Sequence, residues 1–239
     1  MNKEINIKEN LKIVYDLIHE EENKAGREQG SVKLVAVSKF HDSKSVIKAI
    51  EAGQFLFGEN RVQEASAKFD EIRNAGFQAD LHIIGTLQRN KVKEAVRIAS
   101  CIESVDRIEL LEEIEKQCEK QNKTIDVFFE LKTGEDTKSG FPDENTLLEC
   151  ARLCGEKRFP RVLLKGLMTM APFTDDEKLI TKSFSVLTAL KEKINSLYPE
   201  LCVNELSMGM SNDFKIAVRE GATIVRIGTA IFGERDYSK

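Results

Sequence analysis

Short β-rich runs of apolar residues alternate with longer amphipathic stretches along most of the chain. The opening segment is different, because its apolar residues recur at helical spacing and predict a helix over Ile5–Asn23. The later amphipathic stretches include Ser43–Ala52, which ends at Gly53, and residues 61–74, 90–99 and 107–120. Eight runs between them are predicted as strands: Lys33–Val37, Phe55–Phe57, His82–Ile84, Cys101–Ser104, Asp126–Leu131, Val162–Thr169, Asn204–Leu206 and Thr223–Ile227.

Strands that alternate with helices favour a parallel sheet, because parallel neighbours need crossover connections. Eight such units after one extra helix predict a single (β/α)8 TIM barrel with an additional N-terminal helix. An open doubly wound sheet is the alternative, and it commonly has a glycine-rich turn after its first strand. Here that turn reads Ser38-Lys39-Phe40-His41, without glycine. No linker or low-complexity run interrupts the pattern, so residues 1–239 are expected to form one domain.

Charge and cysteine content exclude several classes of protein. The chain has 36 basic and 40 acidic residues, a formal net charge of −4, and no basic stripe that would suit nucleic acid. No window approaches the ~18 apolar residues of a membrane span, and the N-terminus lacks the apolar core of a secretory signal. The odd number of cysteines, five, indicates reduced core thiols and a cytoplasmic protein. Cys150 and Cys154 lie one helical turn apart, where packing in the core is favoured over metal binding.

In a barrel of this kind the functional site lies at the carboxyl ends of the strands. The last two predicted strands end in segments of small and hydroxyl residues, 207–213 and 226–230. Small residues let backbone N–H groups approach an anion closely, and a helix starting near Asn212 or Asp213 would direct its positive end toward that anion. Loops after strands seven and eight of such barrels often hold phosphate, so these segments predict a phosphate cradle.

Lys39 follows the apolar first strand directly, so its stem should leave a dry barrel core. Desolvation there would lower the pKa of the ammonium group, and a neutral amine can condense with an aldehyde. Lys132 and Lys165 are rival candidates, but Lys132 lies in a polar loop and Lys165 falls before the end of its strand. An amine opposite a phosphate cradle suggests an aldehyde-bearing phosphate ester, either pyridoxal phosphate or the sugar phosphate of an aldolase.

Six stretches of the sequence, in order, resemble the pyridoxal phosphate homeostasis proteins, a family of barrels similar to the N-terminal domain of alanine racemase. The resemblance covers essentially the whole chain. It is carried by Val35–Lys39, Phe57–Glu64, His82–Lys91, Gly166–Met170, Leu206–Asp213 and Val225–Gly233.

The resemblance implies a role for each matching residue. Lys39 would hold pyridoxal 5′-phosphate (PLP) as a Schiff base, Asn60 would lie beside the cofactor, and Arg226 would face the pyridine nitrogen. The residues expected around the phosphate are Ser207, Gly209, Met210, Gly228 and Thr229. The chain departs from the family pattern at Leu81, where Trp is frequent, and at Leu131-Lys132, where Asn is common.

Storage of PLP and its delivery to apo-enzymes are expected rather than catalysis. A cation such as Arg226 would keep the pyridine nitrogen unprotonated and so weaken the cofactor as an electron sink. Racemisation also needs a base on each face of the substrate. None of the three tyrosines, Tyr15, Tyr198 and Tyr237, lies at the end of a predicted strand.

Three alternatives remain open: a PLP-dependent amino-acid racemase, a class I aldolase, and a protein-interaction role. The family resemblance implies a monomer. For the histidines, structural roles are favoured at His19 and His82, whereas His41 could help to orient the loop after Lys39.

Overall fold

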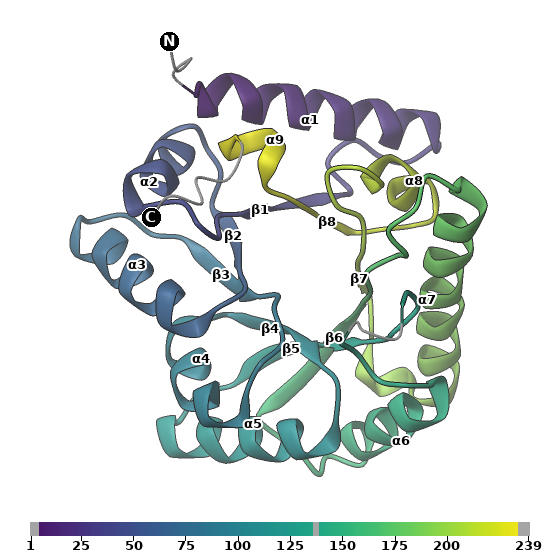
Figure 1. Ribbon diagram of the computed structural model, residues 1–239. Coiled ribbons are helices and arrows are strands. Elements are labelled where there is room, and N and C mark those ends of the chain that lie inside the picture. The colour runs from purple at the N-terminus through teal and green to yellow at the C-terminus, as the bar shows by residue number, and fades with distance from the viewer. Residues whose placement is uncertain (1–4, 136–138, 234–239) are drawn as a thin grey trace.

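The computed structural model describes residues 5–135 and 139–233. Its eight parallel strands close into a barrel in the order of the sequence, with β1 hydrogen-bonded to β8. Figure 1 looks down the barrel, with the strands inside and the helices around them. The (β/α)8 prediction is therefore confirmed. The strands are β1 (Lys33–Val37), β2 (Leu56–Glu59), β3 (Asp80–Ile83), β4 (Cys101–Val105), β5 (Ile125–Glu130), β6 (Val162–Met168), β7 (Glu205–Ser207) and β8 (Ile224–Ile227).

Residues of the strands alternate between the inside of the barrel and the surrounding helices, as the two-residue period of a strand requires. In β1, Leu34 and Ala36 belong to the large core between barrel and helices. Val35 and Val37 belong instead to a small inner cluster with residues from other strands, among them Phe128 of β5. In each strand, therefore, only every second side chain faces the inside of the barrel.

The expected N-terminal helix is α1 (Ile7–Lys24), and it packs against α2, α8 and α9 beside the junction of β1 and β8 (Figure 1). Two side chains fasten this region: Asn10 Nδ2 donates to Ile231 O at 2.9 Å, and Arg27 Nη1 donates to Ala222 O at 2.7 Å. The other helices are α2 (Ser43–Glu51), α3 (Val62–Asn74), α4 (Val92–Ile98), α5 (Ile108–Gln121), α6 (Glu144–Gly155), α7 (Glu177–Leu197), α8 (Phe214–Arg219) and α9 (Thr229–Phe232), with 3-10 turns η1 (Arg89–Lys91) and η2 (Pro199–Leu201).

The second strand lies further along the chain than predicted. The apolar run predicts Phe55–Phe57, but β2 spans Leu56–Glu59. Phe55 is 56% exposed, whereas the charged Glu59 is fully buried and accepts a hydrogen bond from Lys68 at 2.7 Å. Hydropathy alone misplaces the strand because its terminal carboxylate is paired inside the protein.

Four of the five cysteines are buried: Cys101, Cys118, Cys150 and Cys154. Burial raises the pKa of the Cys150 thiol to about 11 and that of Cys154 to about 12. Cys202 is exposed, so the expectation of core thiols is wrong for this residue, which directly follows η2 on the surface. Within the described ranges, none of the helices combines the length and apolar character needed to cross a membrane.

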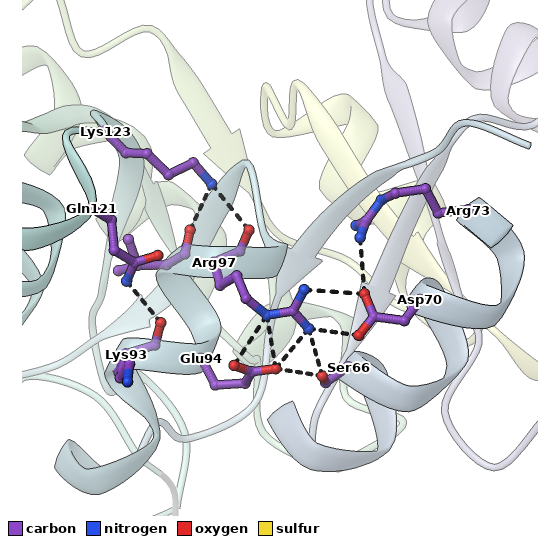
Figure 2. Close-up of polar contacts among 9 residues, drawn as sticks. Ser66, Asp70, Arg73, Lys93, Glu94, Arg97, Gln121 and Lys123 are labelled. Carbon is purple, nitrogen blue, oxygen red and sulfur yellow. Dashed lines mark hydrogen bonds and ion pairs between the residues drawn. The ribbon is translucent and has the colours of Figure 1, made fainter.

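Arg97 links α3 to α4 on the outer surface (Figure 2). Its Nη2 atom lies 2.7 Å from Asp70 Oδ2, 2.8 Å from Glu94 Oε1 and 2.9 Å from Ser66 Oγ. Lys123, beyond the end of α5, donates to Val96 O at 2.8 Å and so joins the same region. These contacts fix the spacing of neighbouring helices on the side of β2, β3 and β4.

Candidate functional site

The turn that carries Lys39 is anchored from the outer side of the barrel. Ser38 Oγ donates to Glu59 Oε1 at 2.7 Å, and Lys68 Nζ donates to both Glu59 Oε1, at 2.7 Å, and Ser38 O, at 2.8 Å. Ser38 is fully buried, and Lys39 is partly buried. Lys39 lies in the turn at the carboxyl end of β1, two residues after the inward-facing Val37.

The two rival lysines lie on β6 and in the loop that follows β5. Lys165 of β6 lines a pocket of about 520 Å³ at the amino ends of the strands, together with Lys33, Asp126 and Glu205. The sequence argument against Lys165 therefore agrees with the structure. Lys132 lies in the loop after β5, where its backbone N–H donates to Phe141 O at 3.1 Å.

The loop after β7 requires glycine at position 209. Gly209 has φ +94°, and a Cβ atom there would lie 2.5 Å from Ala217 Cβ and 2.9 Å from Phe214 Cα. Gly228, directly after β8, approaches the end of β1, since a Cβ at this position would lie 2.9 Å from Val37 O. The close approach of Gly228 brings the last strand's loop beside the turn that carries Lys39.

Three other features of the predicted phosphate cradle, namely Met210, the start of the following helix and Thr229, differ in part from what the sequence predicts. The Met210 N–H donates to Asp213 Oδ1 at 2.5 Å, and the Met210 side chain is 38% exposed. Helix α8 begins at Phe214, close to the predicted start, but is only six residues long. Thr229 is exposed and is the first residue of α9. Asp213 thus occupies one of the backbone donors that the sequence assigned to phosphate.

Arg226 lies inside the barrel and is held on two sides. Its Nη1 donates to Ser207 Oγ at 2.7 Å and its Nη2 to Thr169 O at 2.8 Å. Burial lowers the pKa of Arg226. The Ser207 hydroxyl, predicted to surround phosphate, is fully buried and donates to Glu103 Oε2 at 2.5 Å. Any contact of Ser207 with a ligand would therefore use its backbone or break this hydrogen bond.

Glu103 of β4 was not identified from the sequence. Its Oε1 lies 2.6 Å from His82 Nδ1, and its Oε2 lies 4.0 Å from Arg226 Nη1. Burial alone would raise the pKa of Glu103, but His82, Arg226 and Ser207 together bring this pKa below its usual range. His82 has the predicted structural role, as a partner of a buried carboxylate. The sequence signal that could have identified Glu103 is its position in β4, two residues after Cys101, which faces inward.

Glu130, the last residue of β5, was also missed. It is 1% exposed, and its Oε1 accepts a hydrogen bond from Ser139 Oγ at 2.7 Å. Its Oε2 has no hydrogen-bond partner among the described residues. Burial raises the pKa of Glu130 to about 7. The sequence signal is a charged residue inside an otherwise apolar strand, IDVFFE.

The remaining candidates lie around these groups. Asn60 follows β2 and is partly buried, with its backbone against Gly85 at the end of β3. The His41 ring stacks on Phe232 at a centroid distance of 5.0 Å and so links the Lys39 turn to α9. Tyr15 donates to Gln54 Oε1 at 2.6 Å, and Tyr198 caps the end of α7. Tyr237 lies outside the described residues.

Comparison with known proteins agrees with this geometry. Residues 13–236 match the family described as alanine racemase, N-terminal domain. The chain is 38% identical over 234 residues to the pyridoxal phosphate homeostasis protein of Aquifex aeolicus, covering 98% of this chain and 100% of that one. It is 34% identical over 238 residues to the protein of the same name from Escherichia coli K12, covering 98% of each.

Solved structures extend the comparison to the fold. PipY of Synechococcus elongatus PCC7942, with PLP bound, superposes with a TM-score of 0.79 at 34% identity, covering 90% of this chain and all of that one. A histidine racemase from Leuconostoc mesenteroides has a TM-score of 0.69 at 16% identity, which shows a shared fold only; this chain covers 57% of it. The chain belongs to the pyridoxal phosphate homeostasis protein family, whose members share the barrel of the alanine racemase N-terminal domain.

Proposed function

We propose that the chain binds PLP as a Schiff base on Lys39 and acts in PLP storage and delivery, with little or no catalysis. When bound, PLP supplies an aldehyde that a neutral lysine amine can attack. The observation that carries the proposal is the meeting of β1 and β8, where Gly228 lies against Val37 O. This contact brings the loop after β8 beside the turn that carries Lys39, which supports the proposal.

The residues present fit PLP. Gly209 and Gly228 keep two loops free of side chains, because a Cβ would collide with Ala217 at the first and with Val37 O at the second. Backbone without side chains also lets an anion approach closely. Asn60 and Met210 lie on loops at the same end of the barrel, where Thr229 begins α9. Oε2 of Glu130, which has no hydrogen-bond partner in the described part of the chain, offers a further polar group to a ligand.

The electrostatics favour holding the cofactor over using it. Arg226 is fixed by Ser207 and Thr169 O, so the group proposed to face the pyridine nitrogen is a guanidinium. Facing the pyridine nitrogen, this cation would oppose protonation of the ring and thereby reduce carbanion stabilisation. The described tyrosines, Tyr15 and Tyr198, lie on outer helices and cannot act as a second base.

Delivery to apo-enzymes needs an accessible mouth. Three side chains of the loops that follow β1, β6 and β7 are exposed there: Phe40 (47%), Phe173 (88%) and Met210 (38%). Large exposed apolar residues are common at protein contacts, so these loops are the proposed contact face for a recipient enzyme. We propose that residues 1–239 work as one monomeric unit in this exchange.

The test is borohydride reduction of the chain mixed with PLP, followed by peptide mass mapping. The expected result is a single pyridoxyl adduct on Lys39, lost in Lys39→Ala and kept in Lys165→Ala, whose lysine lies at the opposite end of the barrel. An adduct on Lys165 or Lys132 instead, or no adduct at all, contradicts the proposal.

Catalysis is tested separately by following interconversion of D- and L-alanine by the PLP-loaded chain. Turnover well below ~1 s⁻¹, the low end for ordinary enzymes, is expected. Turnover at or above that rate would favour the racemase alternative, even if PLP is attached to Lys39.

A further inference from the structure

Glu130 is a buried carboxyl group at the mouth of the barrel, and one of its oxygens has no hydrogen-bond partner among residues 5–135 and 139–233. The inner face of β5 carries Asp126 at the amino end, Phe128 in the inner cluster, and Glu130 at the carboxyl end. Glu130 therefore points into the same end of the barrel as Lys39. A buried polar atom without a partner is costly, typically ~1–3 kcal/mol, so such an atom calls for a ligand or a function.

The groups around Glu130 decide its charge. From β8, Arg226 lowers the pKa of Glu130, and Ser139 from the following loop does the same by hydrogen bonding. From the side of β4, Glu103 and Asp106 raise it. The inward residue of β6 beside Glu130 is Met168, which is uncharged. Burial is the largest influence, and the pKa of about 7 leaves much of the carboxyl group protonated near neutrality.

The hydrogen bond from Ser139 indicates which oxygen of Glu130 can carry the proton. Ser139 Oγ donates to Oε1, so Oε1 already acts as an acceptor. A proton on Oε2 gives this oxygen a donor that no described residue accepts. The protonated side chain can therefore donate a hydrogen bond to an acceptor that none of the described residues supplies.

The polar groups of PLP identify the acceptor, given the proposed function. The phosphate is assigned to the loops after β7 and β8, the pyridine nitrogen to Arg226, and the aldehyde carbon to Lys39. The phenolic oxygen remains, on the ring edge away from the phosphate arm. In the closed barrel, β5 lies across from β1. It is separated from β7 and β8, whose loops are assigned to the phosphate, by β6. Glu130 at the end of β5 is therefore on the side of the mouth away from the phosphate, as the phenolic oxygen is.

We propose that protonated Glu130 is a cofactor-binding residue that donates a hydrogen bond from Oε2 to the phenolic oxygen of PLP, so that loading takes up a proton at this carboxyl group. This inference rests on the proposed function and deepens it. The proton comes from solvent, because an anionic acceptor beside Glu130 favours its neutral form. Loading is thereby linked to pH on the alkaline side of neutrality.

The test is calorimetric titration of the full chain with PLP at pH 8 in two buffers that differ in ionisation enthalpy. The dependence of the heat on the buffer gives the number of protons taken up. Glu130→Gln keeps a donor but cannot titrate, so its proton uptake should be smaller than that of the unaltered chain, with affinity within about threefold. Glu130→Ala should bind PLP about tenfold more weakly, as expected for a lost hydrogen bond to a charged acceptor.

Asp126→Asn is the matched control, because Asp126 is another inward carboxyl of β5 whose pKa burial raises, but it lies at the opposite end of the barrel. This variant should keep the proton uptake. Equal uptake in the unaltered chain and in Glu130→Gln, with PLP still attached to Lys39, would overturn the role of Glu130 and leave the proposed function intact. Failure of the unaltered chain to bind PLP would overturn the proposed function itself.

If Glu130→Gln does not fold, the infrared difference spectrum of the unaltered chain with and without PLP decides the question. A protonated carboxyl band that appears or grows on loading at pH 8 is expected. The absence of such a band would contradict proton uptake by a buried carboxyl group.

Discussion

Ser207 Oγ lies 2.5 Å from Glu103 Oε2, although the two residues are 104 positions apart and their strands, β7 and β4, do not pair. The same hydroxyl accepts a hydrogen bond from Arg226. A neutral group thus sits between a buried carboxylate and a buried guanidinium whose closest charged atoms are 4.0 Å apart. This bridge holds Arg226 in the orientation that the proposed cofactor site requires.

Ser207→Ala should therefore destabilise the chain. Both Glu103 and Arg226 would lose a hydrogen bond in a dry interior, which predicts a decrease of about 1–3 kcal/mol in the free energy of unfolding. Ser185→Ala is the control, because that hydroxyl also contacts a glutamate, Glu220 at 3.1 Å, but on the exposed face of α7. Urea unfolding checks the prediction, and equal midpoints for the two variants would contradict it.

Glu130 should make stability without PLP depend on pH. Its pKa is about 7 in the folded chain, against an ordinary value of 4.5, so the folded state retains this proton more tightly than the unfolded state. The contribution to stability is complete below pH 4.5 and is lost as pH rises through about 7, by up to about 3 kcal/mol. Unfolding of the unaltered chain and of Glu130→Gln at pH 5 and pH 8 measures it; the variant should lack this decline.

Gly209→Ala should be more harmful than an alanine at another glycine of similar backbone conformation. Gly53 has φ +96° and open space where a Cβ atom would lie, so Gly53→Ala should cost only the backbone strain of about 1–2 kcal/mol. At Gly209 the same strain is joined by a collision with Ala217, and a loss of roughly 3 kcal/mol or more is expected. Thermal unfolding compares the variants, and similar losses would show that the loop after β7 yields readily.

Arg97→Ala tests the surface network of Figure 2. Arg97 is 40% exposed and binds Asp70 and Glu94 together, so its removal should cost about 1 kcal/mol, near the upper end for surface ion pairs. Arg158→Ala removes a single exposed pair with Glu112 at 3.1 Å and should change stability by less than ~0.5 kcal/mol. If 0.5 M salt does not reduce the difference between the variants, its origin is not electrostatic.

The sequence predicted the architecture well, because alternating strand and helix patterns depend mainly on apolar spacing. The first strand is placed at the residues the pattern indicates, Lys33–Val37. Errors occur where a charged residue belongs to a strand. Glu59 is paired with Lys68 from α3, a partner that only the folded chain brings within reach.

The candidate site was predicted in part, and the missing part has one physical cause. Lys39 and the small-residue loops are recognisable because they end strands and form a familiar pattern. Glu103 and Glu130 are not, because their partners come from distant strands and the surrounding loop, as Ser207 and Ser139 do. The residues next to a buried carboxylate in sequence do not reveal its burial, because the groups that surround it come from other parts of the chain.

The contact between Gly228 and the end of β1 has a consequence for how the site is made. The lysine-bearing turn follows the first strand, but its neighbouring loop follows the last strand, some 190 residues later. Contacts so distant along a chain form late in folding. A nascent chain therefore cannot form the proposed site until β8 and the loop after it have been made, and PLP cannot assist the earlier steps of folding by binding there.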